Sequence, residues 1–299
     1  MTQSNVIELA DVVPHRSVSQ LSTYTQCGEQ YRLQRVAKVP ERPAAWFMHG
    51  SGFHEAIEEW ELSERQMTLD QAQKVALDYY DKAIAEALEK EPDYSRFMTG
   101  GRKKGENDIA DRRVKMAEQV GIYIQYALAH QDEWRIARFG PRGVAAELEF
   151  NIQFGPVMVK GFIDQVRETI DGRLIPVDLK SGSKEPASGF QLAVYAHAIN
   201  EYLGTLPQSG AFFMPKLRQN GTLVGDVWKD LTPFTRELVN GMFEDFDKAE
   251  RAGIYIPNPS DSCRTCSVAE FCRVKGDPQK IPLFSGIKTR QEALAHTSG

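Results

Sequence analysis

The sequence predicts an α/β (α+β) fold in which helices flank a small mixed sheet. Through most of the first 130 residues, apolar side chains recur at the spacing of amphipathic helices. Between residues 144 and 180 the pattern changes to runs rich in Val, Ile and Phe, separated by Gly155-Pro156 and Asp171-Gly172. Such runs between turn residues are typical of antiparallel strands. Helix-like and strand-like segments then follow one another to residue 252, which places further helices against the sheet.

Helices are expected first along the chain, and Ser17 with Gln20 forms a predicted capping box at the start of the first one. The four helices before the sheet are expected at residues 18–37, 44–62, 68–90 and 107–131. An antiparallel meander follows, with strands at 144–154, 157–168 and 173–180. The remaining predicted elements are a helix at 186–203, strands at 209–214 and 222–228, and a helix at 233–252.

These elements divide the chain into five predicted parts. They are an N-terminal arm (1–16), a helical region (17–142), a sheet-containing core (143–255), a C-terminal cysteine segment (256–280) and a tail (281–299).

Of the 299 residues, 41% are apolar and 26% are charged, which is the composition of a globular protein with a sizeable core.

Composition and charge narrow the function. No segment approaches about 18 consecutive apolar residues, and the N-terminus lacks the pattern of a signal peptide, so we expect no membrane span and a cytoplasmic location. In that compartment, four cysteines indicate metal binding or catalysis and not disulfides. The net charge of −5 argues mildly against a nucleic-acid-binding protein. A local basic patch is sufficient for phosphate contacts, however, so the charge does not exclude that function.

Carboxylates gather on neighbouring strands of the predicted meander. Asp178 and Lys180 are two residues apart and therefore share one face of their strand. A two-residue turn at Gly155-Pro156 sets Glu147 opposite Asp164, and a three-residue turn before the last strand sets Asp164 opposite Asp178. Like charges in such positions destabilise a sheet unless a cation lies among them, and carboxylates suit Mg²⁺ or Mn²⁺. An isolated D-x-K pattern is more often a solvated strand edge, but the two matching turns favour a metal site.

Four short motifs resemble those of RecB-like PD-(D/E)XK nucleases. Gly161-Phe162-Ile163-Asp164 is similar to the G-x-x-D motif of that family, and Asp178-Leu179-Lys180 is similar to its D/E-x-K. Gly50-Ser51-Gly52-Phe53-His54 resembles G-x-x-x-H, and Gln191-Leu192-Ala193-Val194-Tyr195 resembles Q-x-x-x-Y. Each motif is weak alone, but their order along the chain is that of the family. The resemblance implies a restriction-endonuclease-like fold and metal-dependent cleavage of DNA.

The resemblance also implies a role for each motif residue. The implied metal ligands are His54, Asp164, Asp178 and the carbonyl of Leu179, and the implied catalytic or supporting residues are Asp164, Asp178, Lys180, Glu147, Gln191 and Tyr195. Glu147 matches a common upstream acid, although Glu149 on the same strand face could replace it. Without the family, a lone histidine is more often packed or exposed than a ligand, as we expect for His49. Gln191 and Tyr195 would likewise be an ordinary helix rim.

The four cysteines of the chain form one ligand pattern. Cys263, Cys266 and Cys272 are closely spaced near the C-terminus, and the other cysteine is Cys27. A tetrahedral zinc or a four-iron cluster needs four ligands, so the set is complete only if Cys27 joins it. The cofactor would then staple the first helix to the C-terminal segment. Unrelated thiols are the less favoured interpretation, because every cysteine fits the pattern.

The C-x2-C-x5-C spacing with one distant cysteine resembles the iron–sulfur nucleases of the AddB class and the CRISPR-associated exonucleases. Ser22, Tyr24 and Tyr31 around Cys27 are similar to the N-terminal motif of those proteins, whereas Gly28 replaces a proline often found after that cysteine. The resemblance implies a 4Fe-4S cluster as the cofactor. Zinc is the alternative, because spacing alone does not identify the metal.

Basic and aromatic residues supply candidates for DNA contacts. The loop Gly101-Arg102-Lys103-Lys104-Gly105 can approach phosphates, although a solvated loop is an equally good interpretation. Aromatic side chains suit stacking on single-stranded bases, with core packing as the alternative for Trp46. The further candidates are Arg112, Arg113, Arg135, Arg138 and Arg142, and the aromatic residues Trp46, Tyr94 and Phe97.

We therefore predict a Mg²⁺- or Mn²⁺-dependent deoxyribonuclease of a phage or prokaryote, an exonuclease on single-stranded DNA or DNA ends in recombination, repair or spacer processing. The alternative is a non-catalytic DNA-binding or assembly factor on the same scaffold. The intact Asp164, Asp178 and Lys180 favour the enzyme. The chain has no room for a helicase, so we expect it to act alone, as a homo-oligomer, or with partner proteins of recombination or CRISPR adaptation.

Overall fold

A computed structural model places residues 15–215, 218–219, 222–223 and 225–282. The predicted arm at 1–16 and tail at 281–299 therefore lie almost entirely outside the described residues. Within the described part, helices and strands follow one another largely as the sequence predicts.

Helices make up the first part of the chain and the sheet follows. The helices are α1 (Val18–Gln26), α2 (Gly28–Tyr31), α3 (Ala45–Leu62), α4 (Leu69–Lys90), α5 (Gly105–Ala129), α6 (Phe190–Leu203) and α7 (Arg236–Arg251). The short turns are the π-helical η1 (Arg32–Val36) and the 3-10 turns η2 (Tyr94–Arg96), η3 (Asp261–Thr265), η4 (Ala269–Phe271) and η5 (Pro278–Lys280). The strands are β1 (Trp134–Ile136), β2 (Ala146–Phe154), β3 (Val157–Thr169), β4 (Leu174–Leu179), β5 (Ser209–Phe213), β6 (Arg218–Gln219), β7 (Thr222–Leu223) and β8 (Asp226–Asp230).

The main sheet has the strand order β1-β3-β4-β5-β8, and β2 also pairs with β3. β2 and β3 are antiparallel with Leu148 opposite Ile163. β3 and β4 are antiparallel with Gln165 opposite Val177. Both registers are those predicted from the turn lengths, so the predicted meander is confirmed. β4 and β5 run parallel, which makes the sheet mixed.

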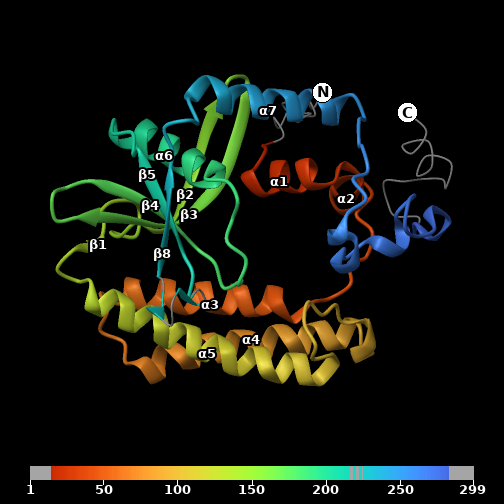
Figure 1. The fold of residues 1–299 in the computed structure, drawn as a ribbon, viewed down its shortest axis with the longest axis horizontal. Helices are drawn as coiled ribbons and strands as arrows, with labels where there is room; N and C mark the ends of the chain where they lie inside the picture. Colours follow the sequence, from red (N-terminus) through yellow and green to blue (C-terminus); the bar gives the residue numbers. More distant parts are fainter. Residues whose placement is uncertain (1–14, 216–217, 220–221, 224, 283–299) are drawn as a thin grey trace, which may run out of the picture.

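Helices cover the sheet on two sides. Figure 1 shows α3, α4 and α5 as one layer below the sheet, and α6 and α7 above it. The predicted capping box at Ser17 begins α1. α7 turns Val239, Phe243 and Phe246 inward at helical spacing, so that its apolar stripe packs on β2 and β3.

Three predicted elements need correction. The helix predicted at 18–37 is interrupted at Cys27, whose extended backbone (φ −163°, ψ 110°) separates α1 from α2. The strand predicted at 222–228 is divided into β7 and β8, and residue 224 lies outside the described residues. α6 begins only at Phe190, after its N-cap Gly189. The sequence also does not predict β1, because three residues are too few for a period-two pattern.

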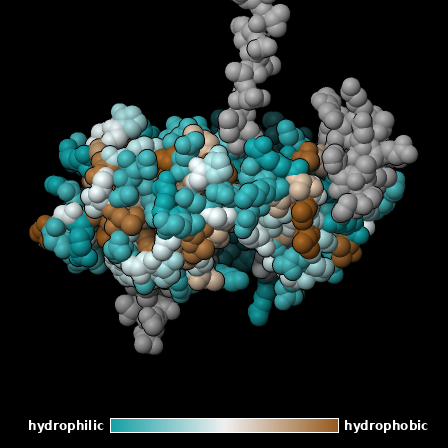
Figure 2. Space-filling model, turned by 90° about the horizontal axis from the view of Figure 1, so that it is seen from above, coloured by the Kyte–Doolittle hydropathy of each residue, from teal (hydrophilic) through white to brown (hydrophobic). Residues whose placement is uncertain are grey.

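Large apolar side chains are buried between the helical layer and the sheet, as the fully enclosed Trp60, Tyr123 and Phe213 show. On the face seen in Figure 2, hydrophilic residues cover most of the surface and apolar residues form small scattered groups. No helix in the described part is long and apolar enough to cross a membrane.

The first helices and the C-terminal cysteine segment lie side by side (Figure 1). Gly28 donates its backbone N–H to the carbonyl of Ile256 at 2.9 Å. A Cβ on Gly28 would lie 2.7 Å from the Ile256 nitrogen. Neither a proline, which has no N–H, nor a larger residue fits here, which explains the glycine after Cys27. A separate apolar cluster joins the same segments through Leu33, Ala37, Val39, Val268, Phe271 and Ile281.

Candidate functional site

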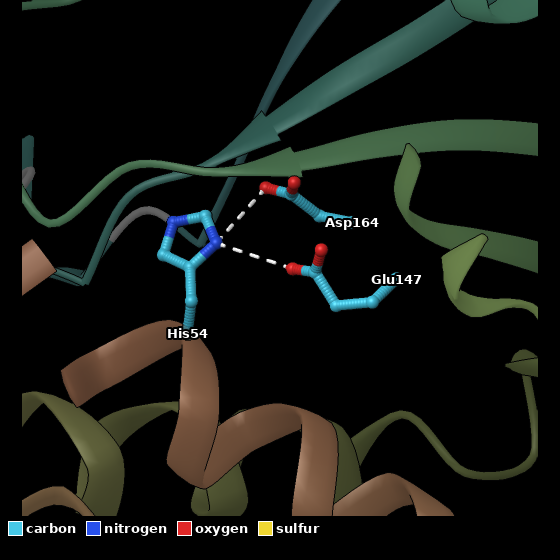
Figure 3. Close-up of side chains that lie close together, drawn as sticks. All are labelled: His54, Glu147 and Asp164. Carbon is cyan, nitrogen blue, oxygen red and sulfur yellow. Dashed lines mark ion pairs between the residues drawn. The ribbon is translucent and has the colours of Figure 1, made fainter. Parts of the chain in front are cut away.

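Three side chains from three elements meet between α3 and the sheet. His54 points from α3 toward Glu147 of β2 and Asp164 of β3 (Figure 3). His54 Nδ1 lies 3.6 Å from Glu147 Oε1 and 3.5 Å from Asp164 Oδ2. One ligand atom of each residue lies within 4.8 Å of the other two. Two carboxylates and an imidazole at this separation fit a divalent cation.

Glu147 has a φ of 45°, in the left-handed region that residues other than glycine rarely occupy. The residues on either side of it, Ala146 and Leu148, keep their partners on β3. Local backbone strain of this kind clusters at functional sites. The Glu147 carboxylate faces His54, whereas Glu149 pairs with Lys160 and is half exposed. Of the two glutamates that the sequence leaves open, the fold therefore brings Glu147 to the site.

The backbone of Leu179 connects the histidine to Asp164. Its N–H donates to Asp164 Oδ2 at 2.7 Å, and its carbonyl oxygen accepts from His54 Nε2 at 2.8 Å. A carbonyl can only accept, so Nε2 carries a proton and Nδ1 is the nitrogen that faces the carboxylates. Metal-bound histidines ordinarily donate their other N–H to such a partner. The contact thus orients the ring for ligation through Nδ1.

Burial and neighbouring charge shift the pKa values in the site. Burial lowers the pKa of His54, but the negative charge of Asp164 and the hydrogen bond with Glu147 outweigh it and raise that pKa to about 9. Burial and the negative charge of Asp178 raise the pKa of Asp164 well above its usual range. Bound protons therefore offset the excess of carboxylates, and a divalent cation would displace them on binding.

The D-x-K pair and the motif on α6 form a chain of contacts beside the triad. Lys180 Nζ lies 2.6 Å from Asp178 Oδ2 and donates to Gln191 Oε1 at 3.1 Å. Gln191 Nε2 in turn donates to the Tyr195 hydroxyl at 2.8 Å. The Tyr195 hydroxyl lies 3.5 Å from Asp178 Oδ1. The motif residues thus form one connected region, in which Asp178 faces Lys180 and lies outside the group of three.

Residues 15–273, from just before α1 to just after the last cysteine, match the family model of the PD-(D/E)XK nuclease superfamily. The chain belongs to this superfamily. It is 34% identical over 269 residues to the Gene 69 protein of Mycobacterium phage D29. It is 33% identical over 286 residues to the Gene 69 protein of Mycobacterium phage L5. Each comparison covers 88% of this chain and 97% of the relative.

Membership of the PD-(D/E)XK superfamily indicates a nuclease, and hence a hydrolase that acts on DNA with divalent metal ions. The mixed sheet flanked by helices is consistent with the fold of the superfamily. His54, Glu147 and Asp164 are the candidate metal-binding group. The names of the two phage relatives specify neither a substrate nor a role.

The four cysteines line one small hollow between α1, α2 and the C-terminal segment. Burial raises the pKa of the Cys266 thiol, and the nearby Cys272, Cys27 and Cys263 raise it further, so the four sulfurs lie close together. All four are among the described residues, and no three of their sulfurs lie within 4.8 Å of one another. The fold therefore gathers four thiols that are distant in sequence around a space wider than a tight tetrahedral site.

Three of the four sulfur atoms accept a hydrogen bond from a backbone N–H. Such bonds stabilise thiolates, and they are among the contacts that tune metal–sulfur sites. The donors are Asn258 to Cys27, Ser260 to Cys263 and Val274 to Cys272, each at 3.4 Å.

The predicted DNA-contacting arginines are each held by a carboxylate. The pairs are Arg112 with Asp108, Arg113 with Asp81, Arg135 with Glu168, Arg138 with Glu64, and Arg142 with Glu58. In the basic loop, Lys103 pairs with Asp111, whereas no ion pair of Arg102 or Lys104 occurs within the described part. Phe97 is only 4% exposed, so its predicted stacking on bases is wrong.

Gln119 of α5 supports the site in a way that the sequence does not signal. It contacts His49 Nε2 through Oε1 at 2.5 Å, and its Nε2 donates to the carbonyl of Ser181 at 3.0 Å. Ser181 directly follows Lys180, so this contact holds the end of the D-x-K motif against the helical layer. His49 is packed, as expected. No local pattern reveals Gln119, because its partners are 70 and 62 residues away.

Proposed function

We propose that the chain is a Mg²⁺- or Mn²⁺-dependent deoxyribonuclease of the RecB-like type. Its proposed active site, where phosphodiester bonds of DNA are hydrolysed, contains His54, Glu147 and Asp164. The observation that carries the proposal is the convergence of these three groups within 4.8 Å, beside the ion pair of Asp178 and Lys180. Buried carboxylates at such separations repel DNA phosphates and destabilise a sheet. A cation that takes part in cleavage needs these carboxylates as ligands, whereas a surface that only binds DNA does not need them.

The position of each side chain sets its role. The group of three would hold the cation, which when bound supplies positive charge for the scissile phosphate and lowers the pKa of a water. Leu179 orients His54 through its carbonyl oxygen. Lys180, placed by Gln191 and Asp178, orients the attacking water or stabilises the charge on the phosphate. Asp178 is close enough to the group to shift the pKa of Asp164 and can complete the ligand set.

Exonuclease action on single-stranded DNA or DNA ends, in recombination, repair or spacer processing, is the finer part of this proposal. It is supported by the RecB-like order of the motifs and by the cysteine pattern shared with AddB-class and CRISPR-associated nucleases. A non-catalytic DNA-binding or assembly factor is the alternative. The contact of Lys180 with both Asp178 and Gln191 favours the enzyme, because a protein without cleavage has no use for that arrangement.

Digestion of end-labelled single- and double-stranded DNA with Mg²⁺ or Mn²⁺ tests the proposal. Asp178→Ala and Lys180→Ala should each lower the cleavage rate by about 100- to 1,000-fold or more, while thermal melting shows a folded protein. Glu147→Ala and Glu149→Ala form a matched pair on one strand. Only the first should lose cleavage, because Glu149 pairs with Lys160 away from His54. Wild-type cleavage by Asp178→Ala would sink the assignment.

We also propose that Cys27, Cys263, Cys266 and Cys272 hold a structural 4Fe-4S cluster. Four thiolates on one zinc ion lie about 3.8 Å apart, because zinc–sulfur bonds are about 2.3 Å and tetrahedral. The wider separation of these sulfurs, no three of which lie within 4.8 Å, favours a larger group in which each thiolate binds its own iron. Zinc remains the alternative. Because the catalytic carboxylates lie elsewhere, we assign the cluster to stability.

Metal analysis of anaerobically purified protein tests the cluster. About four iron per chain and a brown colour would support it, whereas one zinc and no visible absorption would support a zinc staple. Cys27→Ser should lose the colour, melt at a lower temperature and aggregate readily, because ligation adds to the folding free energy. Any folded fraction should retain some cleavage. A colourless, metal-free and fully stable wild type would contradict both metals.

A further inference from the structure

Two hollows adjoin at the start of α3. The first, about 440 Å³, contains His54 and Glu147 of the acidic site, the name we give to His54, Glu147, Asp164, Asp178 and Lys180. The second, about 990 Å³, extends to Gly182 just beyond Lys180 and to Thr265 of the cysteine segment. Trp46 and Phe47 line both of them. We call the two hollows together the groove; one of them contains His54 and Glu147, and the other reaches Thr265 of the cysteine segment.

Phe47 is the most exposed Phe, Tyr or Trp side chain among the described residues, at 60%. Its ring lies beside that of Trp46, with 5.6 Å between centroids. The Arg112 guanidinium lies over the Trp46 ring, 5.6 Å from its centroid, and Asp108 pairs with Arg112 at 2.8 Å. The Trp46 ring, with Arg112 over it, thus lies beside the exposed Phe47 ring where the two hollows meet.

The wider hollow has polar and basic walls that differ from the acidic site. Gln26, Gln30 and Gln34 line it at a spacing of four residues, and Gly100 and Gly101 border it at the start of the basic loop. Its charged lining comprises Arg35 and Arg42 against Glu41, together with Arg112, which pairs with Asp108. Arginine and glutamine side chains are frequent donors to DNA phosphates. This part of the surface is therefore suited to a phosphate backbone in a protein whose net charge is −5.

We propose that the groove holds one strand of DNA, whose bases stack on Phe47, supported by Trp46, as the strand passes from the acidic site toward the cysteine segment. Aromatic rings in a basic groove bind unpaired bases of any sequence. In a duplex the faces of the bases are covered by their neighbours, so the occupant is a single strand. This inference rests on the proposed nuclease function and specifies the path of its substrate.

The test uses an oligonucleotide with 2-aminopurine along its length, whose fluorescence falls when the base stacks on an aromatic ring. Binding is measured with Ca²⁺ in place of Mg²⁺. The wild-type protein should quench the single-stranded probe. Phe47→Ala should lose much of the quenching and bind about 5- to 100-fold more weakly. Phe47→Tyr, which keeps the ring, should retain both properties.

Trp228→Ala is the matched control, because Trp228 is 56% exposed and lies on β8 outside the groove. It should bind and quench like the wild type. Phe47 is exposed, so Phe47→Ala should melt within a few degrees of the wild type, and the melt separates a loss of stacking from a loss of folding. Wild-type quenching and affinity in Phe47→Ala would overturn the inference, as would stronger binding of a duplex than of the single strand.

Cleavage assays on the same proteins separate the two proposals. If the wild type quenches through Phe47 but cuts no DNA with Mg²⁺ or Mn²⁺, the groove stands as a binding site and the nuclease assignment fails. If the wild type cuts DNA and Phe47→Ala cuts and binds equally well, the nuclease assignment stands and the groove is wrong. A wild type that neither binds nor cuts DNA would overturn both.

Discussion

Two polar regions, one partly buried around His54 and one buried around Glu61, are built on the same helix and the same strand, yet they compensate their charges differently. His54 and Glu61 lie about two turns apart on α3, and Asp164 and Gln165 are neighbours on β3. Around Glu61, the Tyr123 hydroxyl donates to Glu61 at 2.6 Å and accepts from Gln165 at 2.6 Å.

The region around Glu61 also contains a second acid, Asp226, and two arginines, each of which pairs with one of the two acids. Arg65 pairs with Glu61 at 2.9 Å, and Arg167 pairs with Asp226 at 2.9 Å. The Arg167 guanidinium lies 3.9 Å from the centre of the Trp134 ring. We call this set, Glu61, Arg65, Tyr123, Gln165, Arg167 and Asp226, the compensated network.

The acidic site, comprising His54, Glu147, Asp164, Asp178 and Lys180, has three carboxylates against one lysine and one histidine. It depends on protons to balance its charge, as the raised pKa values of His54 and Asp164 show. The compensated network serves stability, whereas the acidic site keeps a deficit of positive charge that a cation can fill. Perturbed pKa values mark functional sites in this way, and such sites lower the stability of the fold.

The largest contrast should come from Asp164→Asn. Loss of one carboxylate from the acidic site should reduce cleavage by about 100- to 1,000-fold. The metal-free protein should melt at the same or a higher temperature, because a buried like-charge contact is removed while the amide can still accept from Leu179. Cleavage assays and thermal melting in EDTA check both expectations. Strong destabilisation would mean that the acidic site also stabilises the fold, and the proposed difference between it and the compensated network would then be wrong.

In the compensated network, Arg167→Met should have the opposite effect. It leaves the buried Asp226 without its ion-pair partner, with only the Tyr126 hydroxyl as a donor, and should cost about 3–5 kcal/mol of unfolding free energy, measured by urea denaturation. The folded fraction should still cleave DNA. Arg135→Ala is the control, since Arg135 pairs with Glu168 on the surface and should change stability by less than about 1 kcal/mol. If Arg167→Met and Arg135→Ala lowered the free energy of unfolding equally, burial of the ion pair would not determine its contribution to stability.

A third test uses pH. The pKa of His54 is about 9 in the folded protein against 6.5 as the ordinary value, so its stabilising charge is fully present below pH 6.5 and is lost as pH rises through 9. The raised pKa of Asp164 acts in the same direction. The melting temperature in EDTA should therefore fall over this window, and the increase caused by Mg²⁺ should grow as protons leave the ligands. In Asp164→Asn the Mg²⁺ effect should be small at every pH.

The smallest effect is expected in the basic loop beside the groove. Replacement of Arg102 and Lys104 by Ala should weaken DNA binding and reduce the slope of log affinity against log salt by roughly one unit for each phosphate that the protein no longer neutralises. Lys103→Ala is the internal control, because Lys103 already pairs with Asp111, which it shares with Lys115. Equal slopes for the wild type and the double variant would show that the loop is only solvated.

Local sequence determined the central part of this fold. The lengths of the turns around Gly155-Pro156 and Gly172 predict both strand registers, because a tight hairpin fixes which residues face each other across it. Those registers place Glu147, Asp164 and Asp178 on adjacent strands before any long-range contact is known. The motif order likewise predicted His54 as a partner of these acids, and the fold brings them together.

Tertiary structure decided between alternatives that the local sequence does not distinguish. The choice of Glu147 over Glu149 depends on a left-handed backbone and on the approach of α3. The arginines that suggest DNA contacts are neutralised by acids up to 84 residues away, as Arg142 is by Glu58. Side-chain charge and backbone propensity are properties of a short segment. Whether a charge is paired, buried or open to a cation depends on which distant segments fold against it, and only the packed molecule determines that.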